Sequence, residues 1–381
     1  MKTIMVVTAT RAEYGLLKNV LRHIQESDDL ELILIVTGTH LSEKYGLTVE
    51  EIEQDEIPIA AKISMEVEDA GKPGIVKSMA KLMGALADAI EEFKPDMLLI
   101  LGDRYEMLAC ASAGTAMNIP IAHIAGGEVS YGANDEQIRH AITKMSHIHF
   151  PEADVYANNI KFMGEEKFRV NQVGALGIEN IITTKLLSHK ALNEQLGVAV
   201  DADTFLITYH PATLSKMLAY EMDELITALD GFNNTMIITY PNADNGGEYI
   251  IERWKEFQAT HKNVFLFKSL GTQKYLSTMK YAGLIIGNSS SALIEAPIFK
   301  KPVVNIGKRQ AGRLMATNIL SCSNKKEDIA KAIQKALSPE FRNKVDRTVS
   351  LYGIGNTSEQ IVSILEDLEI NERLITKKLV F

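Results

Sequence analysis

Short apolar runs alternate with longer amphipathic stretches from one end of the chain to the other. Ten of the runs have the length and aliphatic character of buried strands: Ile4–Thr8, Glu31–Thr37, Met97–Leu101, Ile119–Ile124, His147–Phe150, Phe205–Tyr209, Met236–Tyr240, Val264–Phe267, Leu284–Ile286 and Val303–Ile306. Helical patterns lie between them, for example Leu16–Gln25, Ile75–Phe93, Glu221–Phe232, Tyr249–Gln258 and Lys325–Leu337. Because strands that alternate with helices form parallel sheets covered on both faces, the pattern predicts an α/β fold.

The chain has 381 residues, which exceeds the size at which one hydrophobic core usually stops growing. The alternation breaks near residues 164–182, where Val173-Gly174-Ala175-Leu176-Gly177 is small and permissive. We therefore expect an N-terminal domain over residues 1–172 and a C-terminal domain over residues 173–357. The last periodic stretch, Ser358–Leu368, predicts a helix, and we expect residues 358–381 to pack back on the first domain.

Composition and charge narrow the functional classes. The chain is 46% hydrophobic and 23% charged, as ordinary globular proteins are, and its formal net charge of -9 disfavours a general nucleic-acid binder. Its two cysteines, Cys110 and Cys322, are far apart and outside any metal-ligand spacing. No run approaches membrane-spanning length, and the first residues turn polar too early for a signal peptide. We expect a cytoplasmic protein that binds neither nucleic acid nor membranes and holds no metal.

In the first half, charged residues and glycines directly follow two strands. Met97–Leu101 leads into Gly102-Asp103-Arg104-Tyr105-Glu106, and Ile119–Ile124 leads into Gly126-Gly127-Glu128. Ligands bind beyond the carboxyl ends of strands in open parallel sheets, so this is where an active site is expected. Asp103 suits a base and Arg104 suits a phosphate, although Asp before a helix is most often an N-cap.

A predicted helix, Asp135–Met145, follows the glycine pair. Its four-residue spacing pairs Asp135 with Arg139 and Glu136 with His140. Exposed pairs of this kind usually contribute little, but a glycine pair permits close approach of the backbone to a ligand. Several carboxylates that converge on one site would raise at least one pKa, as acid–base catalysis near neutral pH requires.

Several strand-end segments suit phosphates. Arg11 follows the first strand, where it suits a phosphate or, equally, a surface carboxylate partner. In the second half, Gly287-Asn288-Ser289-Ser290-Ser291 offers hydroxyls and free N–H groups, and Glu295 further on suits two ribose hydroxyls. The alternative for this turn is a serine N-cap with a buried Glu. The basic loop Gly307–Arg313 suits a diphosphate. The chain has neither a three-glycine dinucleotide fingerprint nor a Walker A pattern.

Seven motifs together resemble the hydrolysing UDP-N-acetylglucosamine 2-epimerases of sialic-acid and related nonulosonate pathways, over nearly the whole chain. They are Thr-Arg-Ala-Glu-Tyr-Gly at 10–15, Gly-Asp-Arg-Tyr-Glu at 102–106, Gly-Gly-Glu at 126–128, Asp-Glu-Gln-Ile-Arg-His-Ala-Ile-Thr-Lys-Met-Ser at 135–146, His-Pro at 210–211, Gly-Asn-Ser-Ser-Ser at 287–291 and Gly-Lys-Arg-Gln-Ala-Gly-Arg at 307–313.

The resemblance implies a GT-B-like architecture, with two Rossmann-like domains whose parallel sheets face a central cleft for the nucleotide. It implies no metal and no other cofactor. A base takes the C2 proton of UDP-N-acetylglucosamine, UDP leaves by elimination, and water adds to the resulting 2-acetamidoglucal with inversion. The products are N-acetylmannosamine and UDP.

The resemblance and the motifs also assign roles to single residues. Many members carry Glu where this chain has Ala125, and Glu128 or His123 is then a candidate to take over that carboxylate's role. The catalytic residues are expected to be Asp103, Asp135, Glu128, Arg139 and His210. The residues expected around UDP are Arg11, Arg104, His210, Asn242, Asn288, Ser289, Ser290, Glu295, Arg309 and Arg313.

Other functions share these motifs in whole or in part. Related enzymes act on UDP-N,N′-diacetylbacillosamine, whose C4 bears an acetamido group. A GT-B glycosyltransferase would share the phosphate-binding half but would need an acceptor, and a nucleotide-sugar sensor would bind without turnover. A symmetric homo-oligomer is the default for such a protein, and the resemblance implies a homodimer or homotetramer.

Overall fold

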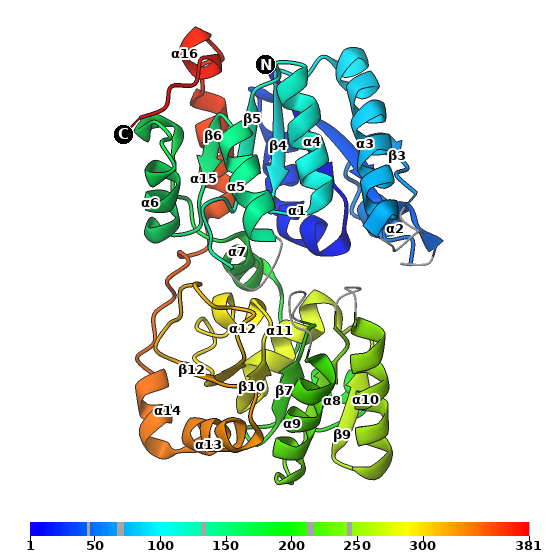
Figure 1. Ribbon diagram of the computed structural model, residues 1–381, viewed down its shortest axis with the longest axis vertical. Coiled ribbons are helices and arrows are strands. Elements are labelled where there is room, and N and C mark those ends of the chain that lie inside the picture. The colour runs from blue at the N-terminus through cyan, green and yellow to red at the C-terminus, as the bar shows by residue number, and fades with distance from the viewer. Residues whose placement is uncertain (44–45, 67–71, 131–134, 212–216, 242–245, 381) are drawn as a thin grey trace. The chain divides into compact units, whose positions relative to one another are not determined.

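The computed structural model describes residues 1–43, 46–66, 72–130, 135–211, 217–241 and 246–380, which form two compact units (Figure 1). The first unit comprises Met1–Glu128, Asp135–Asn180 and Tyr352–Phe381, and the second comprises Val129–Asn134 and Ile181–Leu351. Each unit contains one six-stranded sheet flanked by helices. The predicted α/β fold with two Rossmann-like domains is confirmed.

The sheet of the first unit is parallel throughout, with the order β3-β2-β1-β4-β5-β6. Its strands are β1 (Lys2–Thr8), β2 (Leu30–Thr37), β3 (Ile59–Ile63), β4 (Met97–Leu101), β5 (Ile121–Ile124) and β6 (Ile148–Phe150). The helices are α1 (Arg11–Glu26), α2 (Val49–Gln54), α3 (Lys72–Phe93), α4 (Tyr105–Ala116), α5 (Asp135–Met145), α6 (Asp154–Phe162), α7 (Leu176–Thr183), α15 (Thr357–Asp367) and α16 (Glu372–Ile375).

The sheet of the second unit is also parallel, with the order β12-β11-β10-β7-β8-β9. Its strands are β7 (Phe205–Thr208), β8 (Met236–Thr239), β9 (Val264–Phe267), β10 (Leu284–Gly287), β11 (Val303–Ile306) and β12 (Ile319–Cys322). The helices are α8 (His189–Leu196), α9 (Leu218–Asp230), α10 (Gly247–Thr260), α11 (Gly271–Tyr281), α12 (Ser291–Ile294), α13 (Lys326–Leu337) and α14 (Pro339–Val345). No helix in the described part of the chain is long and apolar enough to cross a membrane.

Both sheets have the same strand order when each is counted from its own first strand. The chain adds three strands in one direction and then returns to add three on the other side of the first strand. The direction in which successive strands are added therefore reverses between β1 and β4 in one sheet and between β7 and β10 in the other, although all strands remain parallel. At such a reversal, connections leave the two neighbouring strands toward opposite faces, and ligands bind at their carboxyl ends.

The structure contains all ten predicted strands, within two residues at each end, and adds β3 and β12. Both added strands are outermost in their sheets. In β3, side chains alternate between more and less exposed positions up to Ile63, and β12 has no fully buried residue. An edge strand is covered less than a central one and so needs no continuous apolar run. The search for such runs therefore missed both.

The division between the units lies at different residues from the predicted ones. Contacts divide the chain after Asn180, whereas the prediction placed the boundary after residue 172. The reason is that Val173 and Leu176 are buried in the core of the first unit, together with Ile361 and Leu365 of α15. The small residues there permit close packing inside the first unit. The chain rejoins this unit at Tyr352, and Figure 1 draws α15 and α16 (red) within it.

The C-terminal segment is held on the first unit by a buried arginine. The Arg169 side chain is inaccessible to solvent, and its guanidinium donates to three carbonyl oxygens of this segment. The acceptors are Leu374 at 2.7 Å, Arg373 at 2.9 Å and Thr376 at 3.1 Å. Carbonyl groups at the end of a helix have no partner within the helix, so these bonds satisfy the end of α16.

We predict that Arg169→Ala lowers the free energy of unfolding of the first unit by about 2–4 kcal/mol, because the buried carbonyl group of Leu374 and the part-buried ones of Arg373 and Thr376 lose their donor. Urea denaturation followed by far-ultraviolet circular dichroism measures the loss. The single tryptophan, Trp254, is buried in the second unit, so its fluorescence follows that unit separately and should shift less. Arg22→Ala is the control, since Arg22 is half exposed and lies 3.9 Å from Asp55. Equal midpoints for the two variants would contradict the prediction.

Candidate functional site

The turn after β1 is built around a buried carboxylate. Thr10 caps α1 by accepting a hydrogen bond from the Glu13 N–H, and Glu13 Oε2 accepts from the N–H groups of Ala9 at 2.9 Å and Thr10 at 3.2 Å. This is a capping box, which the Thr-x-x-Glu spacing predicts. The other oxygen, Glu13 Oε1, is buried and lies 3.8 Å from Nε of Arg104. Glu13 thus joins the ends of β1 and β4.

Arg104 serves two carboxylates at the end of β4. Its guanidinium donates two hydrogen bonds, each 3.1 Å long, to the carboxylate of Glu106, whose side chain is fully buried. Burial raises the pKa of Glu13 to about 7, the charge of Glu106 raises it further, and Arg104 opposes both effects. The positive charge of Arg104 is therefore already compensated inside the protein, which weighs against a role in binding phosphate.

Asp103 forms an ion pair with Arg139 of α5, whose side chain is 1% exposed. The guanidinium of Arg139 also donates to the Glu128 carbonyl oxygen at 2.9 Å and to Glu136 Oε2 at 3.2 Å. Asp103 keeps 22% of its side chain exposed. The structure thus brings together Asp103 at the end of β4, Arg139 on α5 and the backbone of Glu128.

The carboxylates of α5 differ from the predicted pairing in one respect. Glu136 bonds Nε2 of His140 at 3.0 Å, as predicted, but it also bonds Arg139. Asp135 is the exposed first residue of α5. Residues 131–134, directly before it, lie outside the described residues. Glu128 is 4% exposed.

The glycine pair packs against protein atoms. A Cβ at Gly126 would lie 2.9 Å from Nδ1 of His123, and one at Gly127 would lie 2.4 Å from the carbonyl oxygen of Tyr156. Gly127 also has a φ of +79°, which side chains disfavour. His123 and Tyr156 therefore occupy the side of these glycines where a side chain would stand, and the approach of a ligand to their backbone stays a prediction.

In the second unit, Asn288 ties the ends of the two strands at the reversal together. Its Oδ1 accepts from the His210 N–H at 2.7 Å, and its Nδ2 donates to the His210 carbonyl oxygen at 2.9 Å. The carbonyl oxygen of Asn288 in turn accepts from Arg309 at 3.0 Å and Gln310 at 2.8 Å. The Asn288 side chain is thus engaged with His210, and it was predicted instead to contact UDP. Burial lowers the pKa of His210 to about 3, and Arg309 adds to the effect, so the ring is neutral.

The serine turn leaves two hydroxyl groups available. Ser290 precedes α12 but makes no capping hydrogen bond, and both Ser289 and Ser290 are half-buried. The third serine, Ser291, donates to Glu295 Oε2 at 2.8 Å. Burial raises the pKa of Glu295 to about 7, and the bond from Ser291 opposes the rise. This arrangement departs from the alternative of a serine N-cap.

The remaining predicted residues are more scattered. Arg11 is half exposed and pairs with Glu51 at 2.9 Å, which is the surface ion pair left open by its sequence. Arg313 is half-buried in the loop after β11. Asn242 lies outside the described residues. No group of His, Cys, Asp and Glu side chains in the described ranges is placed to hold a metal ion.

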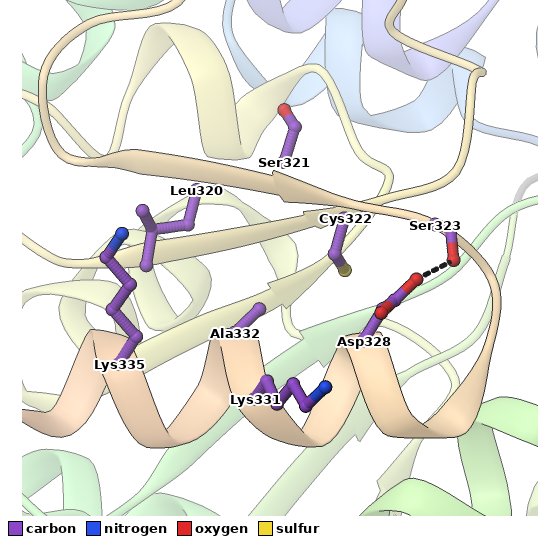
Figure 2. A pocket seen from close by; sticks show the side chains of 8 residues that line it. All are labelled: Leu320, Ser321, Cys322, Ser323, Asp328, Lys331, Ala332 and Lys335. Atoms are coloured by element: carbon purple, nitrogen blue, oxygen red, sulfur yellow. Dashed lines mark hydrogen bonds between the residues drawn. The ribbon is translucent and has the colours of Figure 1, made fainter.

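A surface cavity of about 410 Å³ lies elsewhere, between β12 and α13 (Figure 2). Cys322 and the exposed Lys331 and Lys335 contribute to its lining, and Ser323 donates to Asp328 at its rim. None of the predicted site residues lines it, and β12 is two strands away from the reversal at β10.

Sequence reasoning overlooked three residues of these clusters. Glu13 could have been found from its capping-box spacing to Thr10. Glu106 carries no comparable signal, because only the folded chain shows that it is buried against Arg104. Gln310 lies within the basic loop and was passed over for the arginines on either side.

Comparison with known proteins identifies the family. Residues 22–366 match the family described as UDP-N-acetylglucosamine 2-epimerase. The chain is 44% identical to the GDP/UDP-N,N'-diacetylbacillosamine 2-epimerase (hydrolyzing) of Campylobacter jejuni, over 90% of this chain and 89% of that protein. It is 33% identical to the UDP-N,N'-diacetylbacillosamine 2-epimerase (hydrolyzing) of Legionella pneumophila, over 99% and 98%. It is 32% identical to a UDP-N-acetylglucosamine 2-epimerase of Neisseria meningitidis, over 89% and 88%.

Solved structures of similar proteins show the fold. The chain superposes on a UDP-GlcNAc 2-epimerase from Neisseria meningitidis, solved with UDP-GlcNAc, with a TM-score of 0.81 and 19% identity over 97% of this chain and all of the other. The corresponding enzyme of Methanocaldococcus jannaschii, solved with UDP-GlcNAc and UDP, gives 0.77 and 20% over 97% and all of that chain. The fold is thus of the GT-B-like, two-domain kind. With its two Rossmann-like units and the match over residues 22–366, the chain belongs to the UDP-N-acetylglucosamine 2-epimerase family.

Proposed function

We propose that this protein is a hydrolysing UDP-sugar 2-epimerase. A base removes the proton at C2 of a UDP-linked 2-acetamido sugar, UDP leaves by elimination, and water adds to the 2-acetamidoglucal with inversion at C2. The observation that carries the proposal is the strand-end carboxylate Asp103, paired with the buried Arg139 in a chain of this family. The product serves the biosynthesis of sialic-acid-type sugars in the cytoplasm.

The proton transfers are assigned to the first unit. Asp103 and Asp135 are the proposed acid and base, with Glu128 as a third candidate carboxylate. A base must approach the C2 proton from a fixed direction. The buried guanidinium of Arg139 bonds both Asp103 and Glu136, and so restricts the orientation of these carboxylates. Arg139 therefore orients the catalytic carboxylate.

Binding of the leaving diphosphate is assigned to the second unit. Arg309 and Arg313 supply positive charge, and the hydroxyl groups of Ser289 and Ser290 donate hydrogen bonds to phosphate oxygens. Positive charge and preorganised donors lower the barrier when negative charge develops on the departing UDP. His210 acts as a neutral hydrogen-bonding group, because burial keeps its pKa near 3. Glu295 accepts hydrogen bonds from the ribose hydroxyls.

Two sugars fit this proposal. The sequence motifs favour UDP-N-acetylglucosamine, whereas the relatives at 44% and 33% identity are named for diacetylbacillosamine. Those identities favour the second sugar. Proton NMR of the reaction in deuterated water distinguishes them, because it reports the free 2-epimer and the deuterium at C2 in one experiment. UDP release without any free 2-epimer, from either sugar, would refute the proposal.

The same assay addresses the other enzyme class, and a separate measurement addresses the assembly. A glycosyltransferase would release UDP only with an acceptor, so release in the absence of an acceptor counts against it. We also propose a homodimer or homotetramer, which light scattering measures directly.

We predict that Asp103→Asn lowers kcat by orders of magnitude while UDP still binds, since the second unit retains the diphosphate and ribose groups. Isothermal titration with UDP measures binding, and NMR measures turnover. Asp96→Asn is the matched control: Asp96 is an exposed carboxylate just before β4, at the opposite end of the same strand. Asp135→Asn should behave as Asp103→Asn does. Unchanged turnover in both variants would contradict the roles proposed for Asp103 and Asp135, whereas a wild type that binds UDP without any turnover would indicate a sensor.

We predict that the affinity for UDP rises with pH through about 7, and that Glu295→Gln removes this part of the rise. The raised pKa means that Glu295 is about half protonated at that pH, and the ionised carboxylate accepts from two ribose hydroxyls more strongly than the neutral acid, one of whose oxygens carries a proton. Affinity therefore falls below pH 7 and levels off above it. Isothermal titrations with UDP at several pH values compare the wild type with Glu295→Gln and with the exposed control Glu252→Gln. The protonation of UDP itself changes the affinity of all three proteins equally, so it cancels when they are compared. Identical slopes for all three proteins would contradict the prediction.

A further inference from the structure

A buried histidine joins two neighbouring strand ends of the first unit. His123 on β5 is inaccessible to solvent, and its Nε2 lies 2.8 Å from the carbonyl oxygen of Gly102, directly after β4. A carbonyl oxygen only accepts hydrogen bonds, so Nε2 carries the proton and Nδ1 is the acceptor of a neutral ring. Burial lowers the pKa of His123 to about 4, in agreement with the neutral form.

The Gly102 carbonyl belongs to the peptide group that leads into Asp103. Gly102 also donates its N–H to the carbonyl oxygen of Ile124 at 3.0 Å, so both of its polar groups are tied to β5. Its φ of +82° turns the chain sharply at this point. The orientation of this peptide plane sets the direction in which the Asp103 side chain leaves the backbone. His123 thus anchors Asp103 from the backbone, and Arg139 anchors its carboxylate.

The other side of the histidine ring is closed. A Cβ on Gly126 would lie 2.9 Å from Nδ1 of His123 and 3.1 Å from Oγ1 of Thr143. Both of these atoms are buried, and neither has a hydrogen-bond partner among the residues that the structure describes. The ring is therefore confined between Gly126 and Gly102, and its one hydrogen bond among the described residues goes to the strand end before Asp103.

We propose that His123 is a positioning residue for the epimerase reaction, which holds the Gly102–Asp103 peptide so that Asp103 faces the substrate. The proposal rests on the proposed function, since that function assigns proton transfer to Asp103. It also gives His123 a role other than replacing the carboxylate that is absent at Ala125, because the ring is inaccessible to solvent, its Nε2 is bonded to the backbone and Gly126 lies against its Nδ1.

The chain offers a matched control in His149. This residue pairs with His123 in the register of β5 and β6 and is equally buried. Its Nε2 lies 3.2 Å from Glu165 Oε2, and within the described part of the chain it has no hydrogen bond to the end of β4. A buried histidine is therefore lost in either variant, but only His123 touches the backbone before Asp103.

The test replaces each histidine by glutamine and by asparagine. The amide nitrogen of Gln is as many bonds from Cβ as Nε2 of His, whereas that of Asn corresponds to Nδ1. We expect His123→Asn to lower kcat by about 10–100-fold with little change in UDP affinity, and His123→Gln to restore most of it. Both His149 variants should keep the kcat of the wild type per folded molecule. Amide hydrogen exchange of residues 103–106 should be faster in His123→Asn and unchanged in His149→Asn.

The outcomes separate this proposal from the proposed function. If the wild type converts neither sugar, the proposed function is refuted. Amide hydrogen exchange of residues 103–106 then still tests whether His123 holds the Gly102–Asp103 peptide. If the enzyme is active, wild-type kcat in His123→Asn, an equal loss in His149→Asn, or no difference between the Gln and Asn variants would overturn the positioning role. Should His123→Asn not fold, Gly126→Ala displaces the ring from its other side, and an unchanged kcat in that variant would overturn the role as well.

Discussion

The carboxyl end of a parallel strand leaves backbone groups without partners in the sheet, and in this protein buried side chains tie those ends to each other. Asn288 bonds both backbone groups of His210 across the reversal in the second sheet. Glu13 accepts from two N–H groups after β1. His123 donates to Gly102 after β4. Each unit thereby fixes the residues that follow its central strands, which is the condition for reactive side chains to hold a constant direction.

Two guanidinium groups of the first unit, those of Arg104 and Arg139, each contact two carboxylates. Arg104 lies between Glu13 and Glu106, and Arg139 bonds Asp103 and Glu136. A buried charge without a partner is costly, so these arginines are committed to the carboxylates that surround them. In the second unit, Arg309 donates instead to a backbone carbonyl oxygen, that of Asn288.

The sequence predicted most of the fold because central parallel strands are continuous apolar runs, which periodicity detects. It missed β3 and β12, whose edge positions do not require such runs. The domain boundary was placed at the small residues near Val173, but small residues indicate close packing as well as flexibility, and here Val173 is buried. Asp103 and Arg139 were found from their places after strands, although only the fold shows that they pair.

Other site predictions depended on partners far apart in the chain. Arg104 and Arg11 looked alike as candidates for phosphate, but Arg104 bonds the buried Glu106 and Arg11 bonds the surface residue Glu51. A sequence gives the charge of a residue and its distance along the chain, and it does not give the neighbour that will compensate that charge.

Glu13 and Glu295 illustrate how the same pKa can have different consequences. Burial raises both pKa values to about 7. Glu13 is enclosed by the N–H groups of Ala9 and Thr10 and by the Arg104–Glu106 pair, so the groups that surround its carboxyl belong to the protein itself. Its folded-state pKa lies above the ordinary value of 4.5, and its effect therefore weakens the fold as pH rises from 4.5 through 7. Among the residues that the structure describes, Ser291 donates to Glu295, and hydroxyl donors from a ligand would favour the ionised form of this carboxyl further. The raised pKa of the half-buried Glu295 therefore suits a group that binds a ligand. The raised pKa of Glu13, inside a capping box, affects the stability of the fold.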